Sequence, residues 1–251
     1  MSVKRFLGLF LLFIFFLVAT TPARWVVQTF MPENADIRLS GITGSVWSGH
    51  AESVAIQRQS IKDVSWTINP LVLITGGIGG SVDIQDKVIQ ADGSWKAGFD
   101  QSFSVSDFSI VASAAKLSPM LPLQGASLNG NIKANFDSLS IAQETGLSDV
   151  TGSLDWTKAK VNANGQNLDL GHFKLNLATN DKGQVVANIA KTRNVLDAKG
   201  TITLDWPKSA KLDISVKEEQ QGMLRQAVSF MKKDTEAGRR KLDMTVPLNM
   251  R

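Results

Sequence analysis

The sequence predicts a mainly β protein, in which an N-terminal transmembrane helix is followed by a long antiparallel meander and one C-terminal helix. Three observations predict this fold class. An uncharged apolar run stands at the N-terminus, short runs of alternating apolar and polar residues recur about every ten residues after it, and turn-forming residues separate those runs. The meander would form a curved sheet, an open barrel or a groove.

The apolar run extends from Phe6 to Ala23 and directly follows Lys4 and Arg5. At about 1.5 Å per residue, a helix of this length would reach roughly 27 Å, close to the hydrocarbon thickness of a bilayer. The basic residues would stay in the cytoplasm. We therefore expect residues 1–24 to be a cytoplasmic tip and membrane anchor, with residues 25–251 across the membrane. The residues assigned to the anchor include Phe6, Leu12, Phe16 and Ala23.

A cleaved signal peptide is the alternative interpretation of this run, because its densest apolar part is short enough for one. The sequence Thr21-Pro22-Ala23 is a poor small-residue cleavage site, since a proline lies inside it. Trp25 is placed like an aromatic residue at a membrane interface, which favours a retained anchor. Both interpretations send the body across the membrane and differ on whether it stays tethered.

The body is predicted to consist of half-buried strands, because its apolar residues recur with a period of two. Loops such as 180–183 (Asn-Asp-Lys-Gly) join neighbouring runs and indicate hairpins. No helical pattern separates the runs, so a sheet, sandwich or open barrel is expected. Residues expected to share one face within their own strands are Leu128, Gly130, Ile132, Ala134 and Phe136; Ile202, Leu204 and Trp206; and Leu212, Ile214 and Val216.

Three segments interrupt this pattern, and one more strand could follow them. The glycines of 76–80 predict a sharp bend, a bulge or a close backbone approach. The segment 118–122 (Ser-Pro-Met-Leu-Pro) is the best candidate for a boundary within the body. An apolar stripe predicts one soluble helix from Lys217 to Lys233. Residues 241–248 could add a last edge strand that Pro247 ends.

The composition favours a binding protein over an enzyme. The chain has no cysteine, hence no disulfide framework or thiolate metal site, and its net charge of +4 is spread along the chain without a nucleic-acid-binding module. Its two histidines, His50 and His172, stand far apart and outside any catalytic or metal-binding motif. We expect no catalytic residue, cofactor or metal. A one-sided sheet left partly open would instead bind lipid or an apolar partner surface.

The stretch from Leu39 to Ala51, LSGITGSVWSGHA, resembles the N-terminal signature of type II secretion system protein N, Gly-x-x-Gly-[Ser/Thr]-x-Trp-x-Gly shortly after a membrane anchor. Read physically, the two glycines at 44 and 49 would bracket a short strand whose large buried residue is the tryptophan between them. We expect its replacement by alanine to cost about 3–5 kcal/mol if it is core. The signature residues are Gly41, Gly44, Ser45, Trp47 and Gly49.

This resemblance implies an inner-membrane protein with a single membrane pass and a β-rich periplasmic domain. It would be an accessory or assembly subunit that contacts other subunits of the type II secretion machinery and catalyses no reaction. The family also looks similar to the AsmA-like β-groove proteins implicated in lipid traffic, which implies the alternative of a lipid-binding or lipid-transfer groove.

Overall fold

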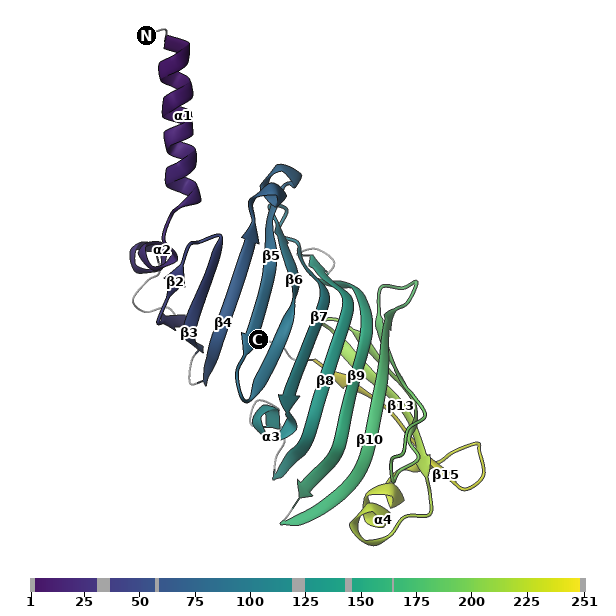
Figure 1. The fold of residues 1–251 in the computed structure, drawn as a ribbon. Coiled ribbons are helices and arrows are strands. Elements are labelled where there is room, and N and C mark those ends of the chain that lie inside the picture. Colours follow the sequence, from purple (N-terminus) through teal and green to yellow (C-terminus); the bar gives the residue numbers. More distant parts are fainter. Residues whose placement is uncertain are drawn as a thin grey trace. The chain divides into compact units, whose positions relative to one another are not determined.

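The structure is a computed structural model that describes residues 3–30, 37–56, 59–118, 125–142, 146–163 and 165–248. Most of these residues lie in antiparallel strands, and consecutive strands pair with one another in most cases. The predicted mainly β antiparallel meander is therefore confirmed. The chain divides into two compact units, Met1–Phe99 and Asp100–Arg251 (Figure 1).

Unit 1 begins with two helices and continues as an open sheet in the order β1-β3-β4-β5-β6, with β2 paired to β3. A short 3-10 helix, η1, connects β4 to β5. The elements are α1 (Val3–Ala19), α2 (Ala23–Phe30), β1 (Ile37–Ser40), β2 (Thr43–Gly44), β3 (Ser48–Ile56), β4 (Gln59–Asn69), η1 (Pro70–Thr75), β5 (Gly77–Gln85) and β6 (Ile89–Gly98).

The prediction of one continuous helix from Phe6 to Ala23 is wrong at its C-terminal end, because α1 stops at Ala19. Pro22 has no N–H to continue the helix and disfavours helical geometry in the residue before it. The hydroxyls of Thr20 and Thr21 instead donate to carbonyls of the last turn of α1. Ala23 becomes the buried first residue of the separate helix α2.

Among the described residues, no helix combines the length and the apolar character that crossing a bilayer requires. The transmembrane helix predicted from the sequence is thus not confirmed.

The glycine run at 76–80 forms the bend and the close approach expected of it. Gly76, with a φ of 83°, ends η1 and turns the chain into β5. Gly80 lies against the neighbouring strand, where a Cβ atom would stand 1.8 Å from the Thr67 carbonyl oxygen. The tight packing of β5 on β4 therefore depends on the absence of side chains here.

A buried carboxylate holds the turn between β5 and β6. Asp86 is only 7% exposed, and it accepts hydrogen bonds from the backbone N–H groups of Val88 at 2.6 Å, Lys62 at 3.0 Å and Ile89 at 3.4 Å. These bonds, that from Val88 foremost, lower the pKa of Asp86. The carboxylate therefore joins β4 to this turn.

We expect Asp86→Ala to lower the free energy of unfolding by about 2 kcal/mol at pH 7, since it removes the shared acceptor of three backbone N–H groups. The folded-state pKa of Asp86 is depressed, so its stabilisation is present above the unfolded pKa of about 3.9 and is lost as the pH falls through the folded value. Urea denaturation should show the gap between the variant and the wild type closing below about pH 4. Exposed Asp92→Ala is the control; equal losses for both variants would contradict the assignment.

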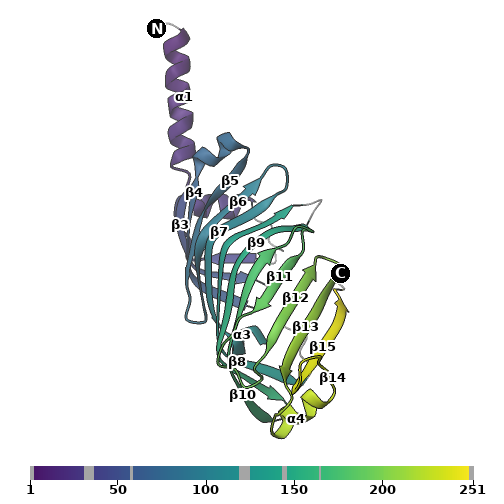
Figure 2. The same cartoon turned by 90° about the vertical axis from the view of Figure 1, so that its right-hand side faces the viewer.

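Unit 2 is an open sheet in the order β7-β8-β9-β10-β11-β12-β13-β15-β14, whose strands curve along their length (Figure 2). Two short helices accompany it. The elements are β7 (Phe103–Ser113), α3 (Ala114–Leu117), β8 (Ala126–Ala142), β9 (Gly146–Ala163), β10 (Gln166–Thr179), β11 (Val185–Ile189), β12 (Lys199–Asp205), β13 (Ser209–Lys217), α4 (Gly222–Ser229), β14 (Lys232–Lys233) and β15 (Arg239–Pro247).

One face of the unit 2 sheet is apolar across successive strands, because the registers align the alternating residues. Ala134 pairs with Leu154, Leu154 with Leu175, and Leu175 with Ile189. Farther along the sheet, Ile202 pairs with Leu212 and Leu212 with Met244. Most of these side chains are only half-buried. The other face carries polar pairs such as Asn135 with Ser153.

The predicted helix from Lys217 to Lys233 is wrong in its extent, because α4 covers only Gly222–Ser229. Lys217 ends β13, where it pairs with Arg239, and Lys232–Lys233 forms β14. Gly222 has a φ of 57°, outside helical geometry, so the helix cannot extend toward β13. Within α4, Val228 packs on Val216 and Ala198 and closes one end of the apolar face. The predicted last strand is confirmed as β15.

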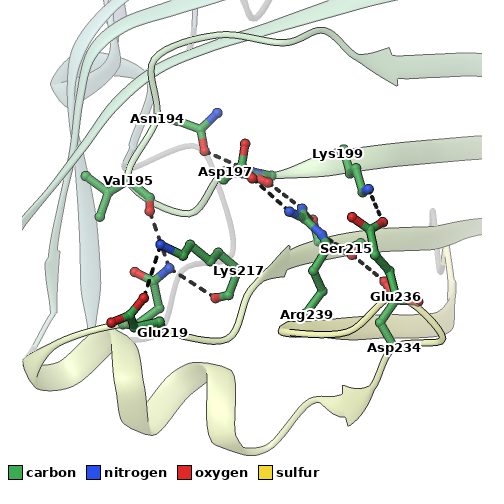
Figure 3. Close-up of polar contacts among 12 residues, drawn as sticks. Asn194, Val195, Asp197, Lys199, Ser215, Lys217, Glu219, Asp234, Glu236 and Arg239 are labelled. Carbon is green, nitrogen blue, oxygen red and sulfur yellow. Dashed lines mark hydrogen bonds and ion pairs between the residues drawn. The ribbon is translucent and has the colours of Figure 1, made fainter.

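A buried arginine links three segments at this end of unit 2 (Figure 3). Arg239 donates to the Asp197 carboxylate at 2.8 Å, the Ser215 hydroxyl at 2.9 Å and the Ser215 carbonyl at 3.0 Å. The Ser215 hydroxyl in turn donates to Asp234. The bond from Arg239 lowers the pKa of Asp197, and that from Ser215 lowers the pKa of Asp234. The loop before β12 is thereby fastened to β13 and β15.

The boundary predicted at 118–122 falls almost wholly outside the described residues. Ser118 is described, and its buried hydroxyl accepts a hydrogen bond from the Leu128 N–H at 3.0 Å. The separation of the two units lies after Phe99.

Candidate functional site

The signature residues form a tight hairpin between β2 and β3. Gly44 pairs with Gly49, the Ser45 N–H donates to the Ser48 carbonyl at 2.9 Å, and the Ser45 hydroxyl accepts from the Ser48 N–H at 3.1 Å. The predicted strand between the two glycines is therefore a turn. The chain can reverse here because Gly44 has a φ of 82°.

The hairpin also binds the C-terminal end of α1. The indole N–H of Trp47 donates to the Val18 carbonyl at 2.8 Å, and the Val46 N–H donates to the Thr21 carbonyl at 3.1 Å. Pro22 forms an isolated antiparallel bridge with Ser45. Carbonyls in the last turn of a helix lack partners within the helix, so the hairpin supplies N–H donors to the backbone carbonyls at the end of α1.

A second tryptophan supports the hairpin from the sheet. The indole N–H of Trp66, on β4, donates to the Val46 carbonyl at 3.0 Å. Its ring lies against Gly49, where a Cβ atom would stand 2.3 Å from Cζ2 of Trp66. Gly49 is therefore needed because any side chain here would collide with the Trp66 ring. Its role is to make room for this ring, and not to bracket a strand as the sequence predicted.

Gly41, the first signature residue, lies beside a cavity of about 350 Å³ between α2 and the first strands. Its φ is 63°, and a Cβ atom would meet the Glu52 side chain at 2.5 Å. Arg24 on α2 and Glu52 on β3 give the cavity one charge of each sign.

The structure separates the predicted anchor residues into two groups. Phe6, Leu12 and Phe16 are exposed on α1, whereas Ala23 is buried in α2. The exposed apolar surface of α1 continues over most of its length, and Trp25 on α2 is also exposed. The hairpin therefore joins a helix with an exposed apolar surface to a folded β unit. Exposed apolar side chains on α1 are Phe6, Leu7, Leu9, Phe10, Leu12, Phe13, Ile14, Phe16, Leu17 and Val18.

The two histidines lie in different units. His50 Nδ1 is 3.1 Å from the Ser65 hydroxyl on the neighbouring strand. His172 Nε2 is 3.1 Å from Asp155, which also lies 3.8 Å from Lys174. Over the described ranges, no three side chains are gathered in a way that could hold a metal ion.

A sequence profile of type II secretion system protein N matches residues 35–243, most of the chain. The chain belongs to the family of type II secretion system protein N. The match begins shortly before the signature hairpin and ends within β15, so it includes strands of both units. No significant match was found among curated proteins or among solved structures.

Membership of this family makes the chain a type II secretion component, and the resemblance found in its signature is confirmed. In this chain the signature forms a joint between α1 and the sheet: Gly44 makes the turn, Trp47 contacts the helix, and Gly49 leaves room for the ring of Trp66.

Sequence reasoning missed the residues on the other side of this joint. Val18 was not singled out from the apolar run, Thr21 was noted only in the poor cleavage site, and Trp66 only as lying in a strand that resembles the family; nothing in the spacing of these residues links them to Trp47. The one available signal was the pair Thr20-Thr21 before Pro22, which is typical of a helix end. The signature tryptophan itself is half-buried in a turn, and the expectation of a fully buried strand residue is wrong.

We expect Trp47→Phe to lower the free energy of unfolding of unit 1 by about 1 kcal/mol, because an aromatic ring is kept, although a smaller one, and the hydrogen bond to Val18 is lost. Trp47→Ala should cost about 2 kcal/mol, below the value for a fully buried tryptophan. Urea denaturation of the full chain in detergent would measure both. A Trp47→Phe variant as stable as the wild type would show that the indole N–H contributes nothing.

Proposed function

We propose that this protein is a non-catalytic accessory subunit of the type II secretion machinery. In this proposal α1 inserts into the inner membrane, the tip before it faces the cytoplasm, and residues 25–251 form a periplasmic β body that contacts other subunits. The observation that carries the proposal is the exposed apolar helix joined by the family signature to a β unit.

The physical case for the anchor is the exposed surface of α1. A water-exposed helix with an almost unbroken apolar surface is unfavourable, since each buried aliphatic side chain gains roughly 1.5–3 kcal/mol on leaving water. Its 17 residues extend about 25 Å at the rise of an α-helix, a little short of the hydrocarbon thickness. Shorter apolar helices are accommodated by local thinning of the bilayer. Lys4 and Arg5 precede this helix, in keeping with a cytoplasmic N-terminus.

The test is affinity purification of the tagged full chain from a bacterium that secretes through this system, together with export measurements in a deletion strain. We expect secretion subunits to be recovered with the protein and the amount of exported cargo to fall in the deletion strain. Recovery of no secretion subunit together with unchanged export would refute the proposal.

A second candidate function is lipid binding by the apolar face of unit 2. It is favoured by the half-buried apolar residues that continue in register from strand to strand, with polar residues on the opposite face. An open apolar face of this chemistry suits lipid acyl chains.

Photo-crosslinking in cells would test this second candidate. A benzophenone amino acid placed at Leu154, on the apolar face, should form lipid adducts that mass spectrometry detects. The same group at the adjacent Ser153, on the polar face, is the matched control. Absence of lipid adducts at Leu154, or equal amounts at both positions, would exclude an acyl-chain groove.

A further inference from the structure

The connection between β4 and β5 forms an apolar tip on unit 1. In η1, Ile74 is 83% exposed, Leu71 is 67% exposed and Leu73 is 43% exposed. Val72 points the other way, and its Cγ1 would lie 3.4 Å from a Cβ atom on Gly79. The turn is thus held to the sheet by one side chain and presents three others to the surroundings.

The sequence around η1 carries no charged residue; charged residues stand nearby only in other segments, where Lys96 on β6 pairs with Gly79 and Asp100 follows Phe99. Between Asp63 and Asp83 every residue is uncharged. Phe99, which is 65% exposed, stands next to the tip because its N–H donates to the Gly76 carbonyl at 2.9 Å. An exposed turn without charges, carrying large aliphatic and aromatic side chains, is unusual for a surface that stays in water.

The tip lies at the end of the sheet to which α1 is joined. Trp47 provides the connection: its indole donates to Val18 at the end of α1, and its carbonyl accepts from the Ile68 N–H at 2.6 Å. Ile68 precedes η1 by two residues. Figures 1 and 2 show the connection between β4 and β5 at the α1 end of the unit 1 sheet.

We propose that η1 and Phe99 form a second membrane contact, which enters the boundary between lipid head groups and acyl chains beside α1. The inference rests on the proposed insertion of α1 in the bilayer. A bilayer is the occupant that fits, because the side chains of η1 and Phe99 are apolar and uncharged and the tip lies at the end of the sheet to which α1 is joined. A single helix would let unit 1 take many orientations relative to the membrane. A second contact on the sheet restricts the orientation of unit 1.

Single-cysteine labelling of the full chain tests this inference, since the sequence contains no cysteine of its own. Ile74→Cys, Leu12→Cys and Ile56→Cys would each carry an environment-sensitive NBD dye in vesicles of phosphatidylethanolamine and phosphatidylglycerol. Ile56 is the matched control, because it is exposed and lies at the opposite end of β3 from the hairpin. Circular dichroism would verify that each labelled variant keeps its β content.

We expect dye at position 74 to shift to shorter emission wavelengths and to be quenched by lipids with a shallow nitroxide, while dye at position 12 is quenched by a deep one. Dye at position 56 should behave as in water. A water-like signal at 74 with a lipid signal at 12 would overturn the second contact and leave the anchor intact. A water-like signal at 12 would overturn the anchor itself. Protection of position 74 only after other secretion subunits are added would identify a protein partner and overturn the lipid assignment.

Discussion

Arg239→Ala is expected to lower the free energy of unfolding of unit 2 by about 3 kcal/mol, the low end of the range for breaking a buried ion pair. The substitution would leave the hydroxyl and carbonyl of Ser215 without their donor and release the loop that contains Asp197. The value is at the low end because the Asp197 carboxylate is exposed and water can replace the guanidinium. Urea denaturation of the detergent-solubilised full chain would measure the change.

Lys199→Ala is the matched control for this substitution. Lys199 pairs with Glu236 in the same corner of unit 2, but both side chains are exposed. Exposed pairs contribute at most about 1 kcal/mol. Equal losses for the two variants would show that burial of Arg239 gives it no special role.

The stability difference between the wild type and Arg239→Ala should depend on pH. Arg239 depresses the folded-state pKa of Asp197. The resulting stabilisation is complete above the unfolded pKa of about 3.9 and is lost as the pH falls through the folded value. The difference in the free energy of unfolding between the wild type and Arg239→Ala should therefore become smaller in acid.

Gly44→Ala is expected to cost unit 1 about 3 kcal/mol, from two sources. A residue with a Cβ atom destabilises the folded state by about 1–2 kcal/mol in the left-handed conformation that Gly44 adopts. The added Cβ would also stand 2.5 Å from the Ser48 carbonyl oxygen, and overpacking typically costs 1–3 kcal/mol more. The variant should open the hairpin and weaken its bonds to α1.

Gly76→Ala separates these two sources. Gly76 has a φ of 83°, nearly that of Gly44, but a Cβ atom there would meet nothing within 4 Å. It should therefore cost only the conformational term of about 1–2 kcal/mol. If chemical denaturation shows equal losses for the two variants, the close approach to Ser48 contributes nothing.

The strands of this protein could be predicted from the sequence because each carries its own signal. Alternation of Ile202, Leu204, Leu212 and Ile214 with polar residues defines a buried face locally, and turn residues mark where each strand ends. The length of α4 was overestimated because only local signals were available. Its stripe of apolar residues indicated a helix, but the pairing of Lys217 with Arg239 is a long-range contact that no local pattern reveals.

The signature was visible in the sequence, but its role was not. Trp47 was expected in a core because large aromatic residues are usually buried there. Its contact with Val18 joins residues separated by 29 positions and depends on where α1 ends. That end follows from Pro22, whereas the docking of the hairpin onto it follows from tertiary structure alone.

Topology in living cells tests most directly the claim that α1 holds the β body outside the cytoplasm. The experiment uses a secreting bacterium that produces full-length Ile56→Cys protein. A maleimide that crosses the outer membrane but not the inner membrane should label the cysteine in intact cells. Carbonate-washed membranes should retain the labelled chain. Labelling only after the inner membrane is broken, or recovery of the intact protein in the soluble cell fraction, would contradict the claim.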